Sequence, residues 1–170
     1  MKIRKYDENN DFDIIKSWVD NEYTHALWCA CRTSFPLERE GFERLLGEIK
    51  ENCGDEPFCA VDDDGETVGF FCYSQTPDTR EGMLKFVIVS NNRRGRGLGR
   101  EMLTYALRLA FGERQAKSVR LMVFLQNERA RRCYESVGFK VRHTERDAFC
   151  YKNEKWSRCN MVIEKEDFSG

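Results

Sequence analysis

The stretch MLKFVIVSNNRRGRGLGREMLTYALRLA, residues 83–110, decides the fold because it passes from a strand through a glycine-rich loop into a helix. Its first part, Met83–Val89, is apolar apart from one lysine, as in strands buried at the centre of a sheet. The loop Arg93–Arg100 is rich in arginine and glycine. Apolar residues then recur at the i, i+3, i+4 spacing of an amphipathic helix, at Leu98, Met102, Leu103, Ala106, Leu109 and Ala110. This order predicts the first half of a β-α-β unit.

The sequence downstream completes the unit. Ser118–Gln126 is a second apolar run and predicts the strand that follows the helix. Asn127–Val137 predicts a short helix that Gly138 stops. Two β-like stretches, about 139–152 and 155–164, close the chain and predict a terminal hairpin.

The sequence upstream predicts a short strand over residues 2–6 and a hairpin. In that hairpin the runs Phe58–Val61 and Thr67–Tyr73 flank an Asp62–Gly65 turn. Hairpins at both ends around a central β-α-β unit favour a mixed, mainly antiparallel sheet flanked by helices. The fold class is therefore α/β, or α+β by stricter naming.

Two further helices are expected before the first hairpin. Asn10–Asp11 caps a helix whose apolar side holds Phe12, Ile15, Trp18 and Val19. Pro36 lies near the start of a second helix with Phe42, Leu45, Leu46 and Ile49 on one side, ending near 52–54. No repeat or Pro/Gly-rich linker interrupts the chain, so residues 1–170 are expected to form a single domain.

Composition excludes several classes of partner. The formal net charge is −1, so the basic excess of a general nucleic-acid binder is missing. Apolar runs fall short of the ~20 residues of a membrane span, and the N-terminus lacks the apolar stretch of a signal peptide. We therefore expect a cytoplasmic protein with neither a nucleic-acid nor a membrane partner, present as a monomer or a homodimer.

The eight cysteines point to a reducing compartment rather than to disulfides or metal. Cys59, Cys72 and Cys150 fall inside apolar strand-like runs, where a reduced cysteine acts as a small hydrophobe. No C-x-x-C pair occurs, and the closely spaced Cys29 and Cys31 have no second pair to complete a zinc site. The Asp62–Gly65 run also lacks the ligand spacing of a calcium loop. No metal is expected.

A glycine-rich loop between a strand and a helix predicts a site for an anion such as pyrophosphate, because backbone N–H groups and the helix dipole converge there. Two nucleotide-binding signatures do not fit. A Walker loop requires Lys-[Ser/Thr] after its last glycine, whereas Arg100 and Glu101 follow Gly99. A Rossmann loop requires a third glycine where Arg100 stands and an acid at the end of the next strand, which here ends in Gln126.

The loop Arg94–Gly99 has the pattern R-x-x-G-x-G and resembles the acetyl-CoA signature of the GNAT superfamily of N-acetyltransferases. The resemblance continues after the next strand in an N-x-x-A…Y…G-F pattern at Asn127, Ala130, Tyr134 and Gly138-Phe139. It covers residues 60–140 well and the rest more loosely. Trp18, Trp28 and the ending from Trp156 to Met161 are similar to RimJ/RimL-type protein N-acetyltransferases.

The resemblance implies acetyl-CoA, or CoA, as the cofactor and direct transfer of its acetyl group to a primary amine, on a protein N-terminus or a small molecule. It assigns the pantetheine arm to the strand residues Phe86, Val87, Ile88 and Val89, with Val87 and Val89 as the pairing positions. It assigns the pyrophosphate to Arg93, Arg94, Gly95, Arg96, Gly97, Leu98, Gly99 and Arg100. Asn127 is expected beside the pantetheine, and Tyr134 beside the thioester sulfur as a proton donor. A strand amide near Val87 is expected to stabilise the developing oxyanion.

No sequence motif identifies the acceptor amine or the residues that bind it. The general base is not identified, since His25, His143, Glu22, Glu81 and Glu145 stand outside any motif. The expected acceptor-lining residues are Trp28, Tyr73, Tyr151, Trp156 and Arg158, with the site bounded by the two N-terminal helices and the last hairpin. Peptide α-amines are favoured over lysine because their pKa, near 8, leaves more neutral amine than a pKa near 10.4. A non-catalytic CoA-binding regulatory module, and RNA contacts through Arg129, Arg131 and Arg132, remain alternatives.

Overall fold

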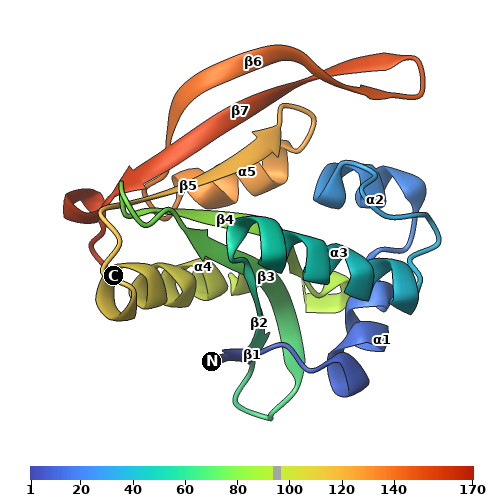
Figure 1. Ribbon diagram of the computed structural model, residues 1–170, viewed down its shortest axis with the longest axis horizontal. Helices are drawn as coiled ribbons and strands as arrows, with labels where there is room; N and C mark the ends of the chain where they lie inside the picture. Colours follow the sequence, from blue (N-terminus) through green and yellow to red (C-terminus); the bar gives the residue numbers. More distant parts are fainter. Residues whose placement is uncertain (94–96) are drawn as a thin grey trace.

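The computed structural model describes residues 1–93 and 97–170, and these form one mixed sheet of seven strands flanked by helices on both faces (Figure 1). The strands are β1 Lys2–Lys5, β2 Glu56–Val61, β3 Thr67–Gln75, β4 Glu81–Val89, β5 Ser118–Phe124, β6 Lys140–Tyr151 and β7 Glu154–Glu164. Their order is β1-β2-β3-β4-β5-β7-β6. β4 and β5 are parallel, and the other neighbouring pairs are antiparallel. The predicted fold class is confirmed.

Five α-helices are described: α1 Glu8–Trp18, α2 Glu22–Cys29, α3 Arg39–Cys53, α4 Leu98–Arg108 and α5 Glu128–Glu135. α4 continues into a wider turn over Leu109–Glu113, and single turns occupy Asn91–Arg93 and Lys165–Asp167. One face of the sheet packs on α4 and α5, and the other packs on α1 and α3. Among the described residues, the helices are too short or too polar for any of them to cross a membrane.

A bulge in the middle of β4 changes which face its side chains meet. Phe70 pairs with Ile88, and Cys72 pairs with Lys85. Between these two pairs β3 has one residue and β4 has two, so β4 contains one extra residue. Leu84 therefore packs in the core under α4, whereas Phe86 and Ile88 pack in the core under α1 and α3. Regular alternation would have put all three on one face.

The same bulge lies where β4 and β5 part. Their parallel register runs from Glu81↔Ser118 to Leu84↔Leu121 and goes no further among the described residues. Phe86, just beyond the last pair, has φ +52°, in a region that residues other than glycine rarely adopt. Beyond Leu84, β4 therefore has no strand partner on its β5 side among the described residues.

The helix limits differ from the sequence prediction at the N-terminus. α1 begins at Glu8 with Asp7 as its cap, rather than at Asn10–Asp11, because Asp11 is fully buried and its carboxylate binds the Arg4 guanidinium at 2.6 Å. α3 begins at Arg39, three residues after Pro36, and ends as expected at Cys53 before Gly54. α2 was not predicted at all.

α2 holds the last hairpin to the rest of the molecule. Asn21 caps its start by accepting a hydrogen bond from the Thr24 amide at 2.8 Å, and Ala30 ends it in a left-handed conformation. Ala26 packs with Phe124 of β5 and Trp156 of β7. In Figure 1, α2 accordingly lies between the hairpin β6–β7 and the layer of α1 and α3.

Cys150 departs from the expectation of buried thiols. Cys59 and Cys72 are fully buried, but Cys150 is exposed because most of β6 is an exposed edge strand. All eight cysteines are unpaired.

Candidate active site

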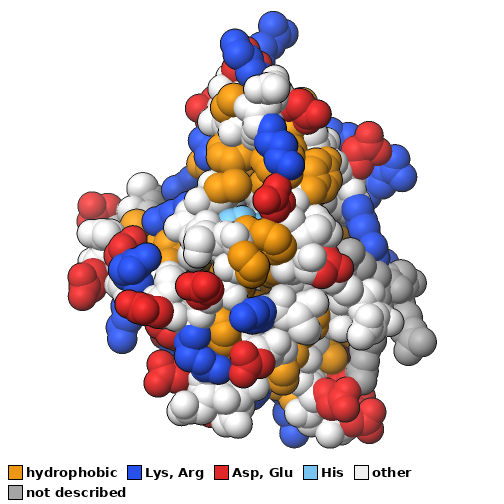
Figure 2. All heavy atoms as spheres, turned by 90° about the vertical axis from the view of Figure 1, so that its right-hand side faces the viewer, with side chains coloured by type: hydrophobic (Ala, Val, Ile, Leu, Met, Phe, Trp, Pro, Cys, Tyr) orange, Lys and Arg blue, Asp and Glu red, His pale blue; other side chains and the backbone are white. Residues whose placement is uncertain are grey.

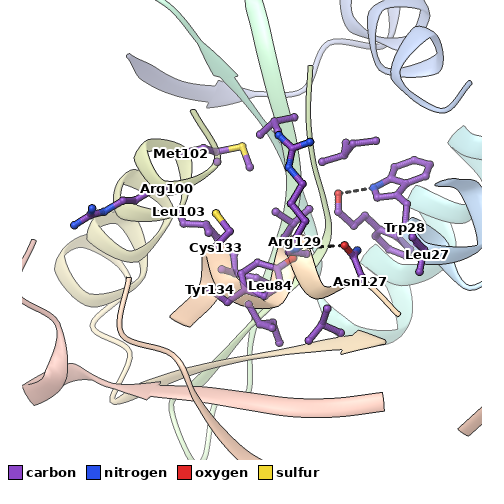
Figure 3. Close-up of a pocket in the computed structure, with 18 of the residues that line it drawn as sticks. Leu27, Trp28, Leu84, Arg100, Met102, Leu103, Asn127, Arg129, Cys133 and Tyr134 are labelled. Carbon is purple, nitrogen blue, oxygen red and sulfur yellow. Dashed lines mark hydrogen bonds between the residues drawn. The ribbon is translucent and has the colours of Figure 1, made fainter. Parts of the chain in front are cut away.

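A cavity of about 340 Å³ opens where β4 and β5 part (Figure 3). β4 and β5 line it from the sheet, the start of α4 and one side of α5 form two further walls, and α2 closes the remaining side. The residues are Thr24, Leu27, Trp28, Leu84 to Val89, Gly97 to Arg100, Met102, Leu103, Leu121 to Val123, Asn127, Arg129, Ala130, Cys133 and Tyr134.

Gly97 to Arg100 of the expected cofactor loop lie at this cavity. Gly97 caps the N-terminus of α4 with φ +80°, and it offers no side-chain acceptor to the first-turn amides. Those amides are therefore available to an anion, which the positive end of the helix also attracts. A side chain at Gly99 would place its Cβ 3.1 Å from Cys133 Sγ, so glycine there permits α4 and α5 to approach closely. Arg94, Gly95 and Arg96 lie outside the described residues.

Tyr134 lines the cavity from α5. It is the buried residue of the otherwise polar helix α5, 7% exposed, and its ring packs edge-on against Phe139 with centroids 6.0 Å apart. Burial, and to a lesser extent the neighbouring Cys133, raises the pKa of Tyr134 above its ordinary value. Its hydroxyl has no hydrogen-bond partner among the described residues. The cavity thus contains a neutral phenol that can donate a proton.

Asn127 orients α5 towards the cavity. Its side-chain oxygen accepts a hydrogen bond from the Ala130 amide at 3.2 Å, so Asn127 is the N-cap of α5 as well as a lining residue. Arg129 and Cys133, four residues apart and hence on one side of α5, also line the cavity, and Figure 3 shows the Arg129 side chain reaching across it. Neither was predicted to line the cofactor site, and Arg129 was considered only as an RNA contact. Their helical spacing with Ala130 and Tyr134 indicates that they share the cavity side of α5.

Trp28 is the acceptor-side candidate that lines the cavity. Its indole Nε1 donates a hydrogen bond to the Phe86 carbonyl oxygen at 2.7 Å (Figure 3). Its ring lies 5.9 to 6.5 Å, centroid to centroid, from the rings of Phe42, Phe70 and Phe86. A helix that was not predicted therefore supplies a wall of the site.

The other acceptor-side candidates lie elsewhere. Tyr73 is buried in the core under α4, where its hydroxyl donates to Gln75 at 2.9 Å. Tyr151 and Trp156 stack with ring centroids 4.7 Å apart in the cluster that docks α2 on the hairpin. Arg158 pairs with Glu145 at 2.6 Å across β6 and β7. The structure does not bring these four to the cavity, because strand position and hairpin packing direct them away from it.

α2 lines the cavity, whereas α1, α3 and the hairpin β6–β7 contribute none of its described lining residues. Figure 2 views this side, where hydrophobic side chains gather below the Lys and Arg residues at the top of the face.

The titratable side chains considered for proton removal also lie outside the cavity lining. His25 is buried in α2, where its Nε2 lies 2.9 Å from Thr33 Oγ1, and burial lowers its pKa. Glu22 pairs with Lys152 at 3.0 Å, and Glu81 pairs with Arg120 at 2.9 Å. His143 is exposed on β6.

Lys85 lines the cavity, but its ammonium is 2.6 Å from the buried carboxylate of Asp55. The described residues also contain no group of three or more His, Cys, Asp or Glu side chains placed to hold a metal ion.

The cavity suits an extended ligand with phosphates at one end and a leaving group at the other. The first turn of α4, Arg129 of α5, the part of β4 beyond its pairing with β5, and the phenol of Tyr134 all line this one cavity.

Known proteins similar to this chain are acetyltransferases. Residues 13–139 match the family described as "Acetyltransferase (GNAT) family". The 5-NmdU N-acetyltransferase of Pseudomonas phage PaMx11 is 31% identical over 128 residues, covering 75% of this chain and 87% of the relative.

Among solved structures, spermidine N-acetyltransferase from Vibrio cholerae in complex with CoA and spermine has a TM-score of 0.83 at 18% identity, covering 99% of this chain and 98% of that one. A mutant of the same enzyme has a TM-score of 0.79 at 16% identity, covering 100% and 98%. These likenesses show the fold.

Proposed function

Because this chain belongs to the GNAT family of acetyltransferases, we propose that the cavity between β4 and β5 is its active site and that Tyr134 is its catalytic acid. The protein is an acetyl-CoA-dependent N-acetyltransferase that acts on an amine. The observation that supports the site assignment is that the buried Tyr134 lines the same cavity as the part of β4 beyond its pairing with β5. We propose further that residues 1–170 are one such domain, working in the reducing cytoplasm that eight unpaired cysteines favour.

Acetyl-CoA fits the cavity with its phosphates at the start of α4. In this proposal the amides of Gly97 to Arg100 receive the pyrophosphate, and the arginines of the loop, together with Arg129, add positive charge. Val87 and Val89 offer backbone groups to the pantetheine amides, in the manner of an added strand. Asn127, already held as the cap of α5, lies on the opposite side of the pantetheine.

Two developing charges have to be stabilised during transfer. Acetyl-CoA supplies an activated acyl group as a thioester, and a neutral amine uses its lone pair to attack the acyl carbon. The Val87 N–H donates to the acyl oxygen as that oxygen gains negative charge. Tyr134 donates its phenolic proton to the departing sulfur, and the raised pKa of Tyr134 keeps that proton available at neutral pH. The amine loses one proton to solvent and Tyr134 takes one back, so the net products are the amide and the free thiol of CoA.

We propose a small primary amine as the acceptor, entering beside α2. The wall there includes Leu27 and Trp28, so an arriving ammonium loses hydration, and desolvation favours the neutral, reactive form. The relatives support a small amine, since their names specify 5-NmdU and spermidine. A peptide α-amine is the second candidate, supported by the RimJ/RimL-like pattern of Trp18, Trp28 and Trp156 to Met161 and by its low pKa.

An acceptor panel tests this proposal. Purified protein is incubated with acetyl-CoA and, separately, polyamines, aminomethylated nucleosides, small monoamines and peptides that carry both an α-amine and a lysine. Thiol release and mass spectrometry should show acetyl on a small amine, or on the peptide α-amine. Exclusive lysine labelling would overturn the acceptor preference and leave the cofactor site intact. CoA binding without turnover on any amine would contradict the catalytic roles.

The pH profile should have a defined shape. kcat/KM for the preferred amine should rise with pH until the amine has lost its proton, because only the neutral form has a lone pair. Burial shifts the pKa of Tyr134 upward, so Tyr134 stays protonated through this rise and should cause no fall below about pH 10. Initial rates at subsaturating amine from pH 6 to pH 10 measure this. A descending limb near neutrality that disappears in Tyr134→Phe would contradict the upward shift.

A further inference from the structure

Trp28 makes a hydrogen bond to the backbone at the β4 bulge. Its indole N–H donates to the Phe86 carbonyl oxygen at 2.7 Å. Phe86 occupies the left-handed region at φ +52°, next to the shift in the β3–β4 register. At a bulge the extra residue leaves the ladder, so its peptide group needs a partner from elsewhere. A side chain of α2 provides that partner.

The carbonyl of Phe86 belongs to the same peptide unit as the N–H of Val87. The unit is planar, and it is trans because the cis bond found among the described residues is Phe35–Pro36. In a trans unit the C=O and N–H point in opposite directions. A donor that fixes the Phe86 oxygen on the α2 side therefore also fixes the direction of the Val87 N–H, on the opposite side of the strand.

We propose that Trp28 is a positioning residue for the reaction: by holding the Phe86 carbonyl it aims the Val87 N–H at the acyl oxygen of acetyl-CoA. This inference rests on the proposed function, in which Val87 is the oxyanion donor. The bond also polarises the peptide, since a hydrogen bond accepted by the C=O strengthens donation by its N–H. Trp28 acts through the peptide and needs no contact with the transferred acetyl group.

Trp28 is held firmly enough for this role. Its ring packs against Phe42 of α3, Phe70 of β3 and Phe86 itself. The helix that carries it is anchored on its other side, where Ala26 packs with Phe124 and Trp156. The oxyanion donor is thus aligned by a helix that lies on the acceptor side, rather than by the elements assigned to the cofactor.

Two replacements of Trp28 remove the donor. Trp28→Phe keeps an aromatic ring, and 3-benzothienylalanine at the same position keeps both fused rings with sulfur in place of the N–H. Loss of a whole oxyanion donor typically costs 10²–10³-fold in kcat, so loss of its alignment should lower kcat by about tenfold or more. Acetyl-CoA affinity by calorimetry should stay within about twofold, because the contact acts on developing charge.

Trp18→Phe is the matched control, since Trp18 is a buried tryptophan of the same core cluster on α1. The melting temperature of Trp18→Phe should fall, whereas its kcat should equal that of the wild type. If Trp28→Phe does not fold, the benzothienyl variant decides the matter. Unchanged kcat in that variant, or a loss of kcat that only parallels weaker acetyl-CoA binding, would overturn the inference. Tyr134→Phe assayed alongside separates the two proposals: if it is slow while the Trp28 variants are fast, only the role of Trp28 fails.

Discussion

Tyr134→Phe should lower kcat by about 10²–10⁴-fold, the contribution of a well-placed general acid. The phenol lines the cavity, and burial raises the pKa of Tyr134 so that it stays protonated. Phenylalanine retains the ring and its contact with Phe139, so the fold and the cavity shape should persist. Acetyl-CoA affinity should change by no more than about twofold, because the proton is needed when the sulfur departs.

Single-turnover kinetics on the preferred amine, under conditions where chemistry limits the rate, provide the measurement. Tyr105→Phe is the control, since Tyr105 lies on α4 beside Arg108 and is absent from the cavity lining. Equal single-turnover rates for wild type and Tyr134→Phe would remove Tyr134 from the mechanism. A restored rate with thiol leaving groups of lower pKa would strengthen its assignment as the acid.

Gly97→Trp should weaken acetyl-CoA binding by about 100-fold or more, equivalent to about 3 kcal/mol. A Cβ at Gly97 meets no atom of the described residues within 4 Å, so they leave room for an added side chain at the proposed pyrophosphate site. The indole would compete with the phosphates for the amides at the start of α4. Calorimetry with acetyl-CoA on the folded variant measures the loss.

Backbone strain has to be separated from this steric effect, because Gly97 has φ +80°. Gly97→Asn is the matched control, since asparagine tolerates the left-handed region better than other side chains and is small. It should bind acetyl-CoA more tightly than Gly97→Trp. Undiminished affinity in Gly97→Trp would move the pyrophosphate away from this loop.

The sequence predicted the parts of the fold whose signals are local. The strand and helix on either side of Arg93–Arg100, the hairpin around Asp62–Gly65 and the helix capped by Asn127 all have caps, turns or clear periodicity. α2 was missed because Glu22–Cys29 is short, ends at alanine rather than glycine, and is stabilised by contacts with Phe124 and Trp156 that lie far away in sequence.

The bulge could not be predicted for a different reason. Met83–Val89 is almost uniformly apolar, so the change of face between Leu84 and Phe86 leaves no break in the pattern. β3 is buried on both faces, and for that reason the sequence could not tell that Tyr73 turns into the core under α4. Which residues lie on the acceptor side is decided by tertiary packing of this kind. The residues proposed for the cofactor lie mostly in a contiguous motif, which the sequence shows directly.

The extra residue in β4 has a consequence for how the gene can change. Insertions and deletions are usually tolerated in surface loops, such as the exposed Asp62–Gly65 turn, and are harmful in strands. In β4 the harm is specific: removing one residue near Phe86 would straighten the strand and restore regular alternation. Side chains beyond the deletion would keep their faces, because Ile88 would still pair with Phe70, but the bulged peptide that Trp28 binds would be lost. The length of this segment, more than the identity of its apolar residues, is therefore what natural variation must preserve.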